Sequence, residues 1–115
     1  MAPSSPNVLH TVASTRASHG GPSRSVPLLC EALWERGASV RLVTTVPEGK
    51  ASVEVLLPEN GVNARTVTEA GRLRQLLRSP IAFYRTLRDE VTRAPPDLLH
   101  DHGLWLPSNA AAALV

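Results

Sequence analysis

A single stretch near the N-terminus constrains the fold more than any other feature of this sequence. Asn7–Val12 (NVLHTV) is a short apolar run rich in β-branched residues, which predicts a strand. A loop over residues 13–23, rich in Ser, Gly and His, leads into a segment with helical spacing that ends at Gly37. Ser39–Thr45 (SVRLVTT) predicts a second strand. Strand, loop, helix and strand in fewer than forty residues make a βαβ unit, which is nearly always right-handed and builds a parallel sheet.

The segments after the second strand continue the alternation of strand and helix. A turn at Asn60-Gly61 precedes residues 62–67, which predict a third strand. Residues 69–78 have leucines at helical spacing, and Ser79-Pro80 then predicts the start of a separate helix, with Ser as the cap and Pro in the first turn. Pro95-Pro96 ends that helix, because proline lacks the N–H group that a helix interior needs.

Each of the two main helical segments has an apolar face that would meet the sheet. In the first, this face consists of Val26, Leu29, Cys30 and Leu33. In the helix that begins at Ser79-Pro80, it consists of Ile81, Tyr84, Leu87 and Val91. Aromatic residues make up only 3% of the chain, so aliphatic side chains must supply most of the core.

The last segments indicate an α/β fold that this chain does not finish. Residues 97–102 (DLLHDH) predict a fourth strand, and Pro107 begins a helix that reaches Val115 without a cap. We therefore expect the first part of a Rossmann-like, doubly wound parallel sheet. This incomplete domain occupies residues 7–115, and residues 1–6 form a mobile tail rich in Pro and Ser.

The loop that leads into the first helix ends in Gly20-Gly21-Pro22-Ser23. Glycine lacks a Cβ atom, so a ligand can approach the backbone of Gly20 and Gly21 closely. The free N–H groups and the dipole of a helix N-terminus favour an anion such as phosphate, and Ser23 is the third candidate phosphate-binding residue. The loop lacks both the three-glycine dinucleotide fingerprint and the Gly-Lys-Ser/Thr of a P-loop. It predicts either a phosphate-binding turn or a tight turn without a ligand.

Two histidines in the predicted fourth strand are the candidate side chains for chemistry. Strand alternation places His100 and His102 on one face and Asp101 on the other. We expect His100 to be a hydrogen-bonded core residue. His102 ends its strand, where open parallel sheets hold their ligands, so it is the candidate catalytic residue. The first and fourth strands of such a sheet are neighbours, which would bring the glycine loop and His102 to one crevice.

A metal site at these histidines is an alternative interpretation. Two histidines on one face can bind a metal, but no third ligand is evident in the sequence, where His10 and His19 are remote candidates. We therefore expect no metal. A metal-dependent hydrolase that uses His100 and His102 stays open as an alternative function, as does a ligand-binding module without chemistry.

Arginine is concentrated between Arg65 and Arg93, where seven arginines accompany three acids. A solvated helix face is the simplest interpretation, and peripheral contact with a membrane surface is the alternative. Nucleic-acid binding is not expected, because few aromatic residues stand among the basic ones. Cys30 is the only cysteine and no apolar run is long enough to span a bilayer, so we expect a cytoplasmic protein, with a peripheral position at the inner face of the membrane as an option.

Two stretches, which together cover about half of the chain, resemble family-4 glycosyltransferases. These are retaining enzymes with two Rossmann-like domains (the GT-B fold). Residues 8–45 are similar to their opening strand, Gly-Gly loop, helix and second strand, through Leu29, Leu33, Arg36, Gly37 and Val40; Ser39 replaces the usual His. Residues 97–114 are similar to their Asp-hydrophobic-hydrophobic-His-x-His strand, through Asp97, Leu98, Leu99, His100 and His102.

The resemblance implies sugar transfer from a nucleotide-sugar donor to a glycan or lipid-linked acceptor. It implies that this domain mainly holds the acceptor, that the glycine loop approaches the donor diphosphate or the acceptor, and that His102 approaches the transferred sugar. No metal cofactor is implied, because the family generally manages without one. Donor binding belongs to a C-terminal domain that these residues do not contain, so we expect the chain alone to be inactive.

Overall fold

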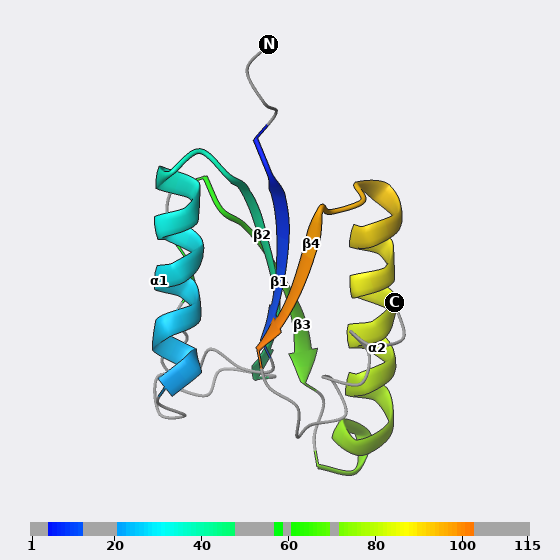
Figure 1. The fold of residues 1–115 in the computed structure, drawn as a ribbon. Helices are drawn as coiled ribbons and strands as arrows, with labels where there is room; N and C mark the ends of the chain where they lie inside the picture. Colours follow the sequence, from blue (N-terminus) through cyan, green and yellow to red (C-terminus); the bar gives the residue numbers. More distant parts are fainter. Residues whose placement is uncertain (1–4, 13–20, 48–56, 59–60, 70–71, 103–115) are drawn as a thin grey trace.

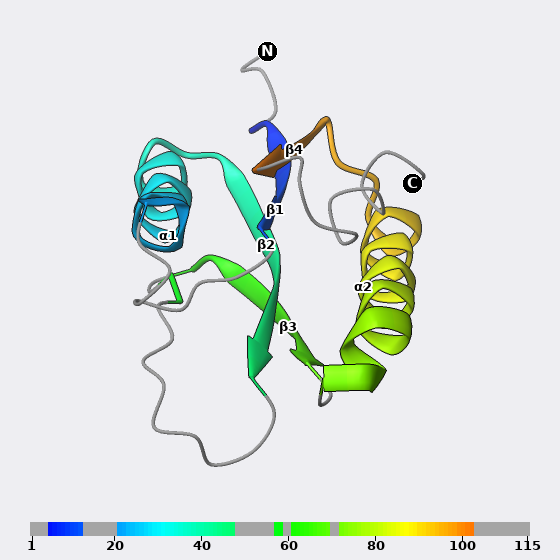
Figure 2. The same cartoon turned by 90° about the horizontal axis from the view of Figure 1, so that it is seen from below.

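The computed structural model describes residues 5–12, 21–47, 57–58, 61–69 and 72–102. The elements follow in the order β1 (Asn7–Val12), α1 (Gly21–Glu35), β2 (Ser39–Pro47), β3 (Asn63–Glu69), α2 (Arg72–Arg93) and β4 (Leu98–His102). The sheet lies between the two helices, with α1 on one face and α2 on the other (Figure 1, Figure 2). The predicted α/β class is confirmed. The helix expected from Pro107 lies outside the described residues.

All pairings in the sheet are parallel, and the strand order is β3-β2-β1-β4. The four predicted strands are present, with β2 and β3 each extending two residues beyond the predicted end. The first and fourth strands are neighbours, as a doubly wound sheet requires. The chain therefore passes to one side of β1 and later returns to the other, and the C-terminal ends of β1 and β4 meet at this reversal.

Helix α1 begins at Gly21, so Gly21, Pro22 and Ser23 belong to its first turn and not to the preceding loop. Proline is compatible with this turn, because its missing N–H group would have no intrahelical partner there. The buried face consists of Ser23, Val26, Pro27 and Cys30. Leu29, predicted on this face, is 38% exposed, because the sheet contacts positions separated by three, four and seven residues from Ser23.

Glycine ends α1 and also permits the close turn before β3. Gly37 has φ 95°, its N–H donates to the Trp34 carbonyl at 2.9 Å, and the Ala38 N–H donates to the Leu33 carbonyl at 3.1 Å. This is the Schellman arrangement, which confirms the predicted cap. Gly61 has φ 72°, and a Cβ atom there would overlap the indole ring of Trp34.

Helix α2 is continuous, and the predicted separate start at Ser79-Pro80 is wrong. A start signal of this kind is local, and a proline inside a long helix removes one hydrogen bond while the others persist. Phe83 and Leu87 are fully buried, whereas Ile81, predicted on the buried stripe, is 53% exposed. Phe83 and Leu87 lie on the side of α2 that meets the sheet, and Ile81 lies outside that side. Neither helix, in the described part of the chain, is long and apolar enough to cross a membrane.

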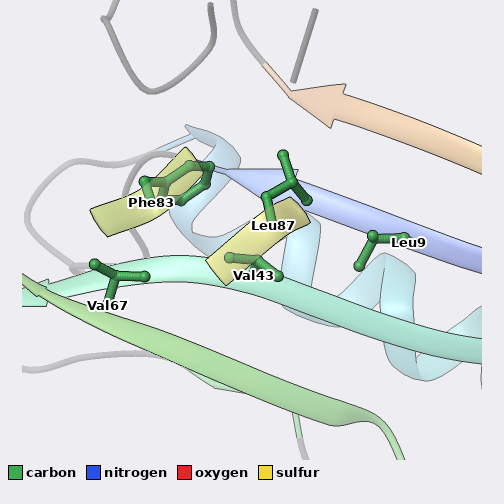
Figure 3. Packing of buried hydrophobic residues seen from close by; sticks show 5 residues of the cluster. All are labelled: Leu9, Val43, Val67, Phe83 and Leu87. Atoms are coloured by element: carbon green, nitrogen blue, oxygen red, sulfur yellow. The ribbon is translucent and has the colours of Figure 1, made fainter. Parts of the chain in front are cut away.

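The sheet divides the apolar core into two clusters. The cluster on the α2 face consists of Leu9, Val43, Val67, Phe83 and Leu87 (Figure 3). The cluster on the α1 face consists of Val12, Val26, Cys30, Val40 and Leu42. Consecutive residues Leu42 and Val43 belong to different clusters, because neighbouring side chains of a strand point to opposite faces.

A buried ion pair joins β2 to α2 beside the apolar cluster. Arg41 Nη1 donates to Glu90 Oε2 at 3.1 Å and to the Glu90 carbonyl at 2.9 Å. The side chains of Arg41 and Glu90 are only 9% and 3% exposed. Arg65 and Arg93 also donate to Glu90, at 3.1 and 2.6 Å, so three guanidinium groups surround this carboxylate. Burying an isolated carboxylate costs far more free energy than burying one that is paired and hydrogen-bonded.

The arginine network lowers the pKa of Glu90. Burial alone would raise it, but the hydrogen bonds from Arg65 and Arg41 and the charge of Arg93 outweigh burial. Arg65 also donates to the exposed neighbour Asp89. Among the arginines of this segment whose side chains the structure describes, Arg65 and Arg93 form ion pairs, and all four, including Arg85 and Arg88, are exposed.

The two glycines Gly61 and Gly21 predict opposite responses to alanine. Gly61→Ala should lower the free energy of unfolding by about 2 kcal/mol or more, because alanine resists positive φ and its Cβ meets Trp34. Gly21→Ala should leave it nearly unchanged, since a Cβ there meets nothing within 4 Å. Urea unfolding of both variants checks this. Equal losses would show that the turn does not pack as described.

The network around Glu90 predicts a large loss from a change of almost no volume. Glu90→Gln should lower the free energy of unfolding by about 3 kcal/mol, because three guanidinium groups lose their carboxylate. Asp89→Asn, which alters the exposed neighbour of the same Arg65, is the matched control and should have little effect.

Comparison of the original chain with Glu90→Gln also tests how the contribution of Glu90 to the free energy of unfolding depends on pH. Because folding lowers the pKa of Glu90, its contribution is present above the ordinary value of 4.5 and is lost as the pH falls below it. The difference between the original chain and Glu90→Gln should therefore shrink below pH 4.5. A difference that is constant with pH would contradict the charged network.

Candidate functional site

Three histidines meet where β1 and β4 lie side by side. The parallel register pairs His10 of β1 with His100 of β4, and Val12 with His102. Paired residues of parallel strands point to the same face, and His102 follows His100 by two positions, so all three imidazoles share that face. It is the α1 face, because Val12, on the same side of β1 as His10, packs against α1 residues.

The three imidazole rings are in direct contact. His10 Nδ1 and His102 Nε2 are 2.9 Å apart, a hydrogen bond in which one nitrogen carries the proton. The centroids of the His100 and His102 rings are 4.0 Å apart in a stacked arrangement, and the His10 ring lies 5.3 Å from His100 and 5.1 Å from His102. One nitrogen from each ring falls within 4.8 Å of the other two.

The three histidines differ in their exposure to solvent. His10 is 1% exposed, His102 is partly buried and His100 is exposed. Burial, followed by the charges of His102 and His100, lowers the pKa of His10 to about 4. Burial and then His100 also lower the pKa of His102, against the opposing effect of Asp101. His10 and His102 are therefore neutral imidazoles at neutral pH.

The prediction that His100 is a core residue is wrong, and among the histidines that the structure describes His10 is the buried one. Strand β4 lies at the edge of the described sheet, and α1 covers β1 and β2, so nothing in the described part of the chain buries His100. His10 was a remote candidate on the sequence because ninety residues separate it from His100. The predicted pairing of β1 with β4, followed residue by residue, places His10 beside His100.

Polar groups on the other face and at the strand ends hold β1 and β4 in register. The Asn7 N–H donates to Asp97 Oδ2 at 2.7 Å, and the Asp97 N–H donates to the Asn7 carbonyl at the same distance. The Thr11 hydroxyl donates to Asp101 Oδ1 at 2.7 Å. Asp101 thus points away from the histidines, as predicted, and Asp97 has a structural role that its place in the motif did not reveal.

The N-terminus of α1 lies at the same edge of the sheet as the end of β4 (Figure 1). Gly21 is its first residue and is exposed, with open space where a Cβ atom would stand. Ser23 is 2% exposed and faces the sheet, so its hydroxyl is not presented to solvent. Gly20 lies outside the described residues, as does His19. Of the two predicted phosphate-binding residues that the structure describes, Gly21 is therefore open to a ligand and Ser23 is buried.

This edge of the sheet combines two chemical capacities. Neutral imidazole offers one donor and one acceptor, which suits hydroxyl groups. The first N–H groups of α1 have no intrahelical partner, and together with the helix dipole they favour an anion. The site therefore suits a ligand that carries both hydroxyl groups and negative charge.

The chain matches a known protein family. The model of the family described as "Glycosyl transferase 4-like domain" matches residues 20–115, which include α1, every later element of the sheet and His102. No curated protein matches the chain.

Proposed function

Because this chain belongs to the glycosyl transferase 4-like domain family, we propose that it is the acceptor-side part of a retaining, nucleotide-sugar-dependent glycosyltransferase. The family match over residues 20–115 carries the proposal. The shared edge of His102 and the N-terminus of α1 supports it, because a nucleotide sugar carries both hydroxyl groups and a diphosphate. The acceptor in this proposal is a glycan or a lipid-linked sugar, and the donor nucleotide is held by a second domain of the GT-B type.

Charge stabilisation at the leaving diphosphate is the first requirement of this reaction. As the glycosidic bond breaks, negative charge grows on the diphosphate, and donors already in place stabilise it without reorganisation. The backbone N–H groups at the start of α1 can supply such donors, and the open space at Gly21 lets a phosphate come close. The proposed transfer uses the nucleotide sugar as co-substrate and needs no metal cofactor.

Positioning of the sugar is the second requirement. His102 is partly exposed, so it can reach a ligand, and its contact with buried His10 holds its ring in one orientation. A neutral imidazole can hydrogen-bond a hydroxyl of the transferred sugar and hold it against the acceptor. His102 does not act as a nucleophile in this proposal.

A cytoplasmic location, with contact to the inner face of the membrane, completes the proposal. The basic segment Arg65–Arg93 would make that contact. Arg65, Arg85, Arg88 and Arg93 are all exposed. Arg65 and Arg93 also pair with Glu90, so we take Arg85 and Arg88 as the arginines that would meet lipid phosphates.

The role of His102 predicts a kinetic effect in the protein with its donor-binding domain. His102→Ala should lower kcat on the order of a hundredfold, because a positioned contact to the sugar is lost. Asp101→Asn, the adjacent residue on the opposite face, is the control and should keep kcat within a fewfold. Turnover close to normal in His102→Ala would place the sugar elsewhere.

The open backbone at Gly21 predicts a graded loss of activity with the size of the side chain. Gly21→Ala should reduce kcat/KM for the donor moderately and Gly21→Val strongly, because each added carbon occupies the space of the phosphate. Thermal melting should show both variants folded, since a Cβ at Gly21 meets nothing within 4 Å. Full activity in Gly21→Val would exclude this helix N-terminus from donor binding.

A further inference from the structure

We propose that His10, His100 and His102 form a binding site for a divalent transition-metal ion such as Zn²⁺, with solvent as the fourth ligand. The proposal does not depend on the proposed sugar transfer, although His102 takes part in both. In the sequence, His100 and His102 offer a metal ion only two ligands from one strand. The fold adds the third histidine from a different strand, through the pairing of His10 with His100.

The positions of the nitrogens suit a metal with three imidazole ligands. Zinc binds histidine nitrogens at about 2.0–2.1 Å in tetrahedral geometry, which places these nitrogens about 3.4 Å from one another. In the structure one pair, His10 Nδ1 and His102 Nε2, is 2.9 Å apart, and one nitrogen from each ring lies within 4.8 Å of the others. The separation that an ion requires lies between the observed 2.9 Å and the 4.8 Å limit.

The donor set selects the class of metal. Neutral imidazole is a ligand for zinc, copper and nickel, whereas magnesium and calcium prefer oxygen ligands. The nearest acid in the sequence, Asp101, points to the other face and accepts a hydrogen bond from Thr11.

The burial of the cluster provides both a fixed ligand and an open side. His10 is held in the interior, and its Nε2 atom has no hydrogen-bond partner among the described residues. His100 is exposed, so an ion can enter from solvent and keep a water molecule as its fourth ligand. Two strands with backbone pairing carry all three ligands, so the site is largely formed before the ion arrives.

Titration of the chain with Co²⁺, followed by displacement with Zn²⁺, tests the proposal. We expect one Co²⁺ per chain with the visible absorption of a four-coordinate ion, and its loss when Zn²⁺ is added. His100→Ala and His102→Ala should each weaken binding at least tenfold. Asp101→Asn, on the same strand but the opposite face, should bind as the original chain does.

A second measurement separates loss of the site from loss of the fold. His100 is exposed, so His100→Ala should keep the circular dichroism and melting behaviour of the original chain. Zn²⁺ should raise the melting temperature of the original chain by several degrees and leave that of His100→Ala unchanged, since only a folded site gains from the ion. The absence of a Co²⁺ spectrum in the original chain, or equal affinity in folded His100→Ala, would overturn the proposal.

Discussion

The pairing of β1 with β4 is the contact on which the candidate site depends. It joins segments ninety residues apart, and polar groups at both ends hold its register, Asn7 with Asp97 and Thr11 with Asp101. A slip of one residue would turn the β4 side chains to the opposite face, because alternation along a strand has a period of two. His100 and His102 would then face α2, and His10 would have no imidazole beside it.

The two faces of the sheet bury different kinds of side chain. The α1 face buries an apolar cluster over β1 and β2, and beside this cluster it carries the imidazole of His10 on β1 and those of His100 and His102 on β4. The α2 face combines an apolar cluster with Arg41 and Glu90. An ion pair of this kind adds little net stability over an apolar pair of similar size, but a misplaced helix would leave both charges unpaired. It therefore specifies where α2 sits on the sheet.

The edge of the sheet supplies groups that different ligands can use. Backbone N–H groups at the start of α1 favour a phosphate, and neutral imidazoles can bind either a hydroxyl or a metal ion. Membership of the glycosyl transferase 4-like domain family favours the sugar, and the convergence of three nitrogens favours the metal. His102 belongs to both arrangements, so an ion held there and a sugar held there would exclude one another.

Local patterns in the sequence determined where the strands and helices form, and tertiary packing decided which of their side chains are buried and which meet. Strand composition predicted β1 to β4, Gly37 predicted the end of α1, and alternation predicted that Asp101 and His102 point apart, because each depends on near neighbours. The continuity of α2 through Ser79-Pro80, the burial of Glu90 and the exposure of His100 depend on which face the sheet covers. The meeting of His10 with His100 follows from a register between distant strands, a quantity that no local pattern contains.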